Sequence, residues 1–77
     1  MKELVEVIAK ALVDSPDEVF VSERREDDGT IVLELHVAKD DMGKVIGKKG
    51  RIAKSIRTVV KTAATKKDLK VVVDIVE

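Results

Sequence analysis

The sequence contains no cysteine, tryptophan or tyrosine, and only one proline, one phenylalanine and one histidine. Without cysteine the chain can form neither a disulfide nor a thiolate metal site, and His36 cannot hold a metal ion by itself. No apolar run approaches the ~18 residues of a membrane-spanning helix, and Glu3 and Glu6 interrupt the first apolar stretch, unlike a signal peptide. These absences lead us to expect a soluble, cytoplasmic protein with no cofactor, no metal ion and no place in a membrane.

The charges are divided unevenly along the chain, although the net charge is zero. Residues 1–42 contain five basic and 12 acidic residues, whereas residues 43–77 contain ten basic and three acidic residues. The span from Lys44 to Lys61 has seven basic residues and no acidic one. A basic stretch of this kind is typical of nucleic-acid binding, while a helix face that pairs with the acidic half of the same fold is the simpler explanation.

The 77 residues suffice for one small domain, residues 1–77, and their apolar spacing predicts six elements. In order, they are a helix over 2–13, strands over 18–24 and 30–38 joined by a turn at 27–29, a short helix from Asp40 or Asp41 as N-cap to Gly47, a longer helix over 51–65, and a strand over 69–76. Three strands with helices on one face make an α+β two-layer sandwich of order α-β-β-α-α-β. We expect Glu34 and His36 on the open face of the sheet and Phe20 in the core.

The segment Gly47-Lys48-Lys49-Gly50 lies inside the basic span, between the two predicted helices. The glycines allow a sharp turn and leave room for an approaching group, and the lysines between them point into water. The second helix presents free N–H groups and its positive dipole end at the same place, which attracts phosphate. A Walker A loop fits poorly, because Gly43 and Gly47 are one residue too close together. The simplest structural explanation is that Gly47 caps one helix and Gly50 forms a turn.

The same four residues resemble the G-x-x-G loop of K-homology (KH) domains, which clamps the backbone of single-stranded nucleic acid. The element order resembles the type II, prokaryotic arrangement of this family, and Val45, Ile46 and Ile52 match the apolar positions beside the loop. Over essentially the whole chain the sequence is similar to the small bacterial stand-alone KH proteins of the KhpA type, including residues 41–44 and 51–54.

This resemblance implies an RNA-binding protein with a groove for about four nucleotides of single-stranded RNA. The residues implied in RNA binding are Lys44, Val45, Ile46, Gly47, Lys48, Lys49, Gly50, Arg51, Ile52, Lys54 and Arg57. The backbone and lysines of the loop would contact phosphates. The floor of the groove would be formed by Val45, Ile46 and either Ile52 or Ile56, together with a residue of the neighbouring strand. Lys61 would extend the basic strip along the helix.

With Phe20 in the core, no aromatic side chain is left for base stacking, which adds ~1–3 kcal/mol per base. Modest affinity favours avidity, and the resemblance implies either a homodimer or a heterodimer with a larger KH-containing protein of the KhpB/Jag type. It further implies a post-transcriptional regulator or RNA chaperone. Two other classes stay open: a protein-interaction or dimerisation module in which nucleic-acid binding is secondary, and a duplex-DNA binder of the helix-turn-helix type. No nucleophile, base and orienting group form a set, so we expect no enzyme activity.

Overall fold

The computed structural model describes residues 1–76, apart from the side chains of Lys48 and Lys49. The elements along the chain are helix α1 (Lys2–Leu12), a short 3-10 turn η1 (Pro16–Glu18), strands β1 (Phe20–Arg25) and β2 (Ile31–His36), helix α2 (Lys39–Lys66) and strand β3 (Val71–Val76). The α+β class and the element order predicted from the sequence are confirmed. Among the described residues, no helix combines the length and the apolar character needed to cross a membrane.

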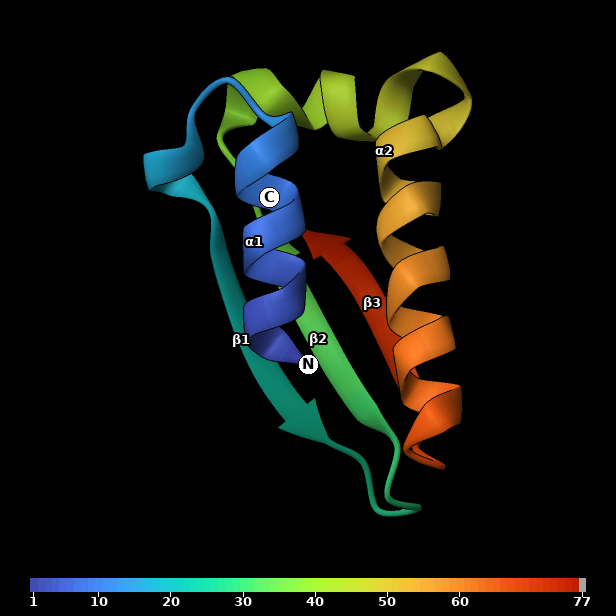
Figure 1. Ribbon diagram of the computed structural model, residues 1–77. Coiled ribbons are helices and arrows are strands. Elements are labelled where there is room, and N and C mark those ends of the chain that lie inside the picture. The colour runs from blue at the N-terminus through green and yellow to red at the C-terminus, as the bar shows by residue number, and fades with distance from the viewer. Residues whose placement is uncertain (77) are drawn as a thin grey trace.

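The three strands form one mixed sheet in the order β1-β2-β3 (Figure 1). β1 and β2 pair antiparallel and are joined by the predicted turn, where Gly29 has a φ of +90°. In this turn the Thr30 N–H donates a 2.9 Å hydrogen bond to the Asp28 carboxylate. β3 pairs parallel to β2, and α2 supplies the crossover that a parallel pair requires. Since β3 pairs only with β2, its other edge is free within the described sheet.

Both helices cover one face of the sheet and bury its alternating apolar side chains (Figure 1). Leu33 and Leu35 of β2 have no exposed surface, because β2 is the central strand and lies beneath the helices. Val5 of α1 and Ile56 of α2 are equally buried and close the core from above. The sheet positions α2 so that its later turns lie beside β3.

Helix α2 changes direction within its length, as Figure 1 shows. Gly50 has a φ of +64°, a left-handed conformation that glycine adopts without steric cost. Helical turns nevertheless run through this point from Lys39 to Lys66. We call residues 39–49 the first arm and residues 51–66 the second arm. The sequence predicted two helices here, with the first ending at Gly47, and the structure moves the change of direction to Gly50.

Two predictions about local structure are wrong. Asp40 and Asp41 are not the N-cap of α2, because the helix begins at Lys39 with Ala38 as the cap residue. Asp41 is instead 1% exposed. Its carboxylate accepts hydrogen bonds from the backbone N–H groups of Asp14 (3.1 Å) and Ser15 (3.0 Å). Asp41 therefore attaches the first arm of α2 to the segment that follows α1.

Phe20 is not a core residue. It is 57% exposed on the open face of the sheet, where it packs against His36 with 5.3 Å between the ring centroids. The reason is the period-two alternation of a strand: Val21, the next residue, faces the helices and is fully buried. The prediction that Phe20 is a core residue rested on its apolar character, whereas the alternation of the strand already places Phe20 and Val21 on opposite faces of the sheet.

Candidate nucleic-acid interface

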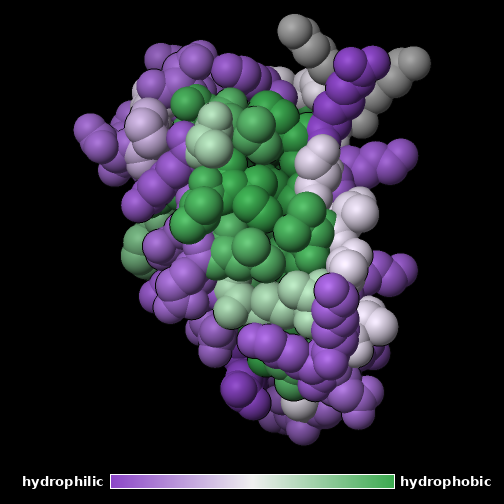
Figure 2. All heavy atoms as spheres, viewed as in Figure 1, coloured by the Kyte–Doolittle hydropathy of each residue, from purple (hydrophilic) through white to green (hydrophobic). Residues whose placement is uncertain are grey.

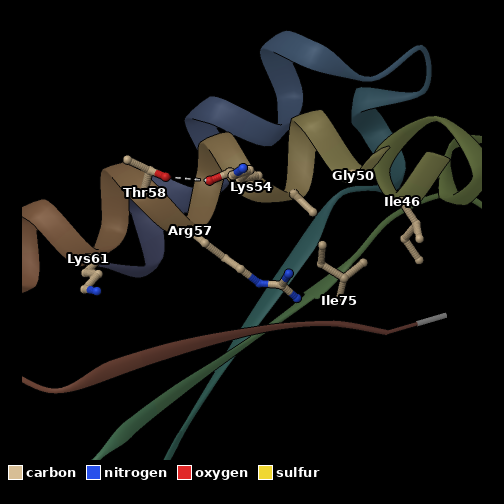
Figure 3. A pocket seen from close by; sticks show the side chains of 8 residues that line it. Ile46, Gly50, Lys54, Arg57, Thr58, Lys61 and Ile75 are labelled. Atoms are coloured by element: carbon tan, nitrogen blue, oxygen red, sulfur yellow. Dashed lines mark hydrogen bonds between the residues drawn. The ribbon is translucent and has the colours of Figure 1, made fainter. Parts of the chain in front are cut away.

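A groove of about 470 Å³ lies between the second arm of α2 and β3 (Figure 3). Its lining comes from three parts of the chain: the first arm of α2, the second arm of α2, and the end of β3. The lining residues are Ile46, Gly50, Ala53, Lys54, Arg57, Thr58, Lys61 and Ile75. The left-handed residue Gly50 thus sits at one end of the groove, where the two arms meet.

The basic side of the groove is formed by Lys54, Arg57 and Lys61, which are exposed and lie at i, i+3 and i+7 of the second arm. Figure 3 shows Arg57 extending from the helix toward β3. Its Nε donates a 3.3 Å hydrogen bond to the backbone oxygen of Val73, on the free edge of the sheet. None of the ion pairs found among the described residues involves these three cations. Their charge is therefore available to an anionic ligand.

The apolar side of the groove is formed by Ile46, Ala53 and Ile75. Ile46 is 54% exposed. Ile75 is half-buried and packs against the core while it faces the groove. An apolar surface beside a row of cations suits a ligand that has both flat apolar parts and phosphates.

The two loop glycines differ in what the fold requires of them. Gly50 has a positive φ, so a side chain there would be strained. Gly47 has no positive φ, and a Cβ built on it would meet nothing within 4 Å. Neither conformation nor packing therefore requires glycine at position 47. The missing side chain at Gly47, beside the bend, leaves room for an external group to approach the backbone closely.

The structure separates the residues implied by the resemblance into different environments. Val45 has no exposed surface and belongs to the core, so it does not line the groove. Ile52 and Ile56 also face the core side, and neither is among the groove residues. A helix turns 100° per residue, which is why Val45 faces the core while Ile46 faces the groove.

The basic residues outside the groove are also separated from one another. The ammonium of Lys44 lies 3.2 Å from the carboxylate of Asp14, beside the end of α1. Arg51 is exposed at the start of the second arm, where the sequence argument placed the positive end of a helix. The side chains of Lys48 and Lys49 lie outside the described residues, so their predicted contacts stay predictions.

The sequence did not indicate three of the groove residues, Ala53, Thr58 and Ile75. It predicted only that one side chain of a neighbouring strand would join the floor of the groove. Ile75 alternates with Val73 and Val71, and this pattern alone indicates only a core face. The parallel crossover puts β3 beside the second arm and leaves Ile75 at the rim. Among the described residues, no three His, Asp or Glu side chains come together as metal ligands.

Apolar side chains also gather on the face of the molecule that carries both helices (Figure 2). In Figure 2 they extend over α1 and toward the second arm of α2, with charged side chains around them. Apolar residues of these helices that keep exposed surface include Leu12 (38%) and Val59 (42%). By helical spacing, Val59 lies on the opposite flank of the second arm from Lys54 and Lys61.

Comparisons with known proteins point to one family. A family model described as KhpA/KhpB, KH domain matches residues 2–75. The chain is 63% identical over 76 residues to the RNA-binding protein KhpA of Clostridium perfringens, covering 99% of this chain and 100% of that protein. It is 47% identical over 77 residues to the RNA-binding protein KhpA of Listeria monocytogenes, with both chains fully covered.

A solved structure shows the same fold in a larger protein. The chain is similar to part of Aquifex aeolicus Era in a crystal structure with GDP and aluminium fluoride bound, with a TM-score of 0.62 and 22% identity. The match covers 97% of this chain but only 30% of that one. At this identity the likeness concerns the fold alone.

Proposed function

The chain belongs to the KhpA/KhpB KH-domain family, and from this premise we propose that it is a single KH domain that binds single-stranded RNA, without catalysis, in the groove between the second arm of α2 and β3. The observation that carries the proposal is the pairing of an apolar wall with a row of unpaired cations next to a glycine bend. The relatives named as RNA-binding proteins support RNA as the ligand.

In this proposal the two sides of the groove have different tasks. Lys54, Arg57 and Lys61 hold phosphates, and Ile46 and Ile75 contact the bases, in a space suited to about four nucleotides. Phe20 lies on the other face of the sheet beside His36 and not in the groove. Stacking on an aromatic ring, which adds ~1–3 kcal/mol per base, is therefore absent from the described groove, and we expect modest affinity.

The test of the loop is the double variant Lys48→Asp with Lys49→Asp. We expect it to abolish RNA binding, because reversed charges repel phosphate. The circular dichroism spectrum and Tm should stay nearly unchanged. The matched control is Lys66→Asp with Lys67→Asp, which changes the net charge equally at the far end of α2. A folded loop variant that binds RNA as tightly as the wild type would contradict the proposal.

Binding to duplex DNA is the competing nucleic-acid function, and the salt dependence separates the two. A four-nucleotide site meets about three phosphates, so the slope of log K against log[salt] should be near −2 for a single strand. A duplex contacted through five cations, Lys44 and Arg51 included, should give a slope nearer −5. Lys44 is paired with Asp14, so it offers less positive charge to a duplex, which favours the single-strand proposal.

The apolar face over the two helices supports a second part of the proposal, a homodimer that joins two weak grooves by avidity. A larger KH protein of the KhpB/Jag type is the alternative partner for a heterodimer. The role that corresponds to either dimer is post-transcriptional regulation or RNA chaperoning. Sedimentation at micromolar concentration should show mass above a monomer for the wild type and a monomer for Val59→Asp. Thr65→Asp is the control, because Thr65 is exposed and lies about 120° around α2 from Val59. A wild-type protein that stays monomeric with and without RNA would contradict the dimer.

A further inference from the structure

A second groove, of about 370 Å³, lies beside the first along the same helix and strand. It is bounded by the last turns of α2, by Leu69 and Lys70 of the connection, and by Val71–Val73 of β3. Arg57 and Lys61 line both grooves. The two grooves are therefore neighbours along one path between α2 and β3, which follows the helix from Ala53 to Thr65 over about 18 Å.

The second groove repeats the chemistry of the first. Its cations are Arg57, Lys61 and Lys70, and no acidic side chain is among its described lining residues, although Lys70 also interacts electrostatically with the carboxylate of Asp28 in the turn between β1 and β2. Its apolar residues include Leu69, which is 41% exposed, and Val71, which is partly buried and packs against the core. A basic rim over an apolar surface again suits a ligand with phosphates and flat apolar groups.

Two further features favour a continuous ligand rather than two separate ones. The hydrogen bond from Arg57 Nε to the Val73 oxygen holds the guanidinium at the junction of the grooves, and its terminal amino groups carry further donors. The free edge of β3 offers unpaired backbone groups beside the path. Such an edge also attracts a peptide strand, but a rim of three cations with no acidic residue in its lining favours a polyanion.

Resting on the proposed function, we propose that single-stranded RNA continues from the first groove into the second, so that one domain contacts more than four nucleotides. Arg57 holds the strand at the junction, and Lys70 contacts a phosphate that a four-nucleotide strand does not reach. Leu69 and Val71 contact the additional bases.

The experiment compares fluorescently labelled single-stranded RNAs of about four and about eight nucleotides across a salt series. Additional registers on a longer strand change its affinity but not the number of phosphates that one domain contacts. Each added phosphate contact should make the slope of log K against log[salt] steeper by about 0.7. We therefore expect a steeper slope for the longer strand.

The decisive variant is Lys70→Gln, with Lys66→Gln as the matched control, because Lys66 carries the same charge and lines neither groove. We expect Lys70→Gln to weaken the longer strand by about fivefold and to reduce its slope by about 0.7, with the shorter strand unaffected. The control should leave both strands unchanged, and thermal unfolding confirms that both variants fold.

Equal effects of Lys70→Gln and Lys66→Gln, or equal slopes for the two strands, would overturn the extended path and leave the four-nucleotide groove intact. If Lys70→Gln loses self-association but keeps its affinity for RNA, the extended path is overturned, and the edge of β3 binds a protein strand instead. A wild-type protein that binds neither strand would overturn the proposed function itself, and the extended path with it.

Discussion

Replacing Gly47 with alanine should make the protein more stable and at the same time a poorer RNA binder. Gly47 lies in helical turns of α2, and a Cβ there would meet no atom within 4 Å. Alanine in a helix interior is more stable than glycine by about 0.5–1 kcal/mol. For a domain of this size that gain corresponds to a rise in Tm of roughly 3–6 °C.

The expected loss of binding comes from a clash between the added methyl group and the RNA, not from a change within the protein. If the RNA backbone approaches the loop at Gly47, the added methyl group takes the place of a phosphate or ribose. We expect the affinity for single-stranded RNA to fall by about tenfold or more, which is about 1.4 kcal/mol. Gly43→Ala is the matched control, since its Cβ also meets no atom within 4 Å in α2. It should gain similar stability and keep its affinity.

Gly50→Ala cannot replace this test, because Gly50 has a φ of +64°. A side chain in that conformation costs roughly 1–2 kcal/mol, so lost binding there would also reflect a changed bend between the arms. Thermal unfolding by circular dichroism and fluorescence anisotropy with labelled RNA measure the two effects separately. A Gly47→Ala protein that is stabilised and binds RNA like the wild type would refute the reasoning.

Two further predictions concern carboxylates outside the groove. Asp41→Ala should lower the free energy of unfolding in urea by about 3 kcal/mol, because the Asp14 and Ser15 N–H groups lose a charged acceptor; a loss below about 1 kcal/mol would contradict it. The Thr30 N–H lowers the pKa of Asp28 from its ordinary 3.8, so the stability that this carboxylate adds is complete above pH 3.8 and is lost as the pH falls through its lower value in the folded protein. The Tm difference between wild type and Asp28→Asn should therefore shrink below pH 3.8, and a constant difference would count against this assignment.

The fold was predictable because local patterns and the global arrangement agree. The alternation of Leu33 and Leu35 indicated a strand with one buried face, and both are fully buried in β2. The turn at Gly29 forms where the sequence places it. Such signals depend on neighbours within a few residues, which is the range over which a sequence pattern carries information.

What the sequence could not indicate depends on contacts between distant residues. Asp41 looked like a helix cap, but the backbone it contacts lies 26 and 27 residues earlier in the chain. Val45 and Ile46 are alike in chemistry, and only the orientation of the first arm on the core decides that Ile46 faces the groove. Ile75 joins the groove because β3 pairs parallel to β2 beside the second arm, and a pattern within one strand does not contain that neighbour.

The zero net charge of the chain is compatible with binding a polyanion because the acidic hairpin is separated in space from the bend of α2. The molecule is 34 Å long, and the hairpin that carries the acidic residues 26–28 lies at the opposite end of Figure 1 from the bend of α2. At physiological ionic strength a charge is screened over about 8 Å, so a strand at the bend interacts with the cations of α2 and hardly with the hairpin. A strand that continues to Lys70 comes closer to Asp28, with which Lys70 interacts electrostatically. The local field of the second arm, rather than the sum over the chain, decides whether RNA is attracted. At low salt the screening length grows to about 30 Å, and the acidic end then opposes binding, which limits the gain in affinity that dilution of salt would otherwise give.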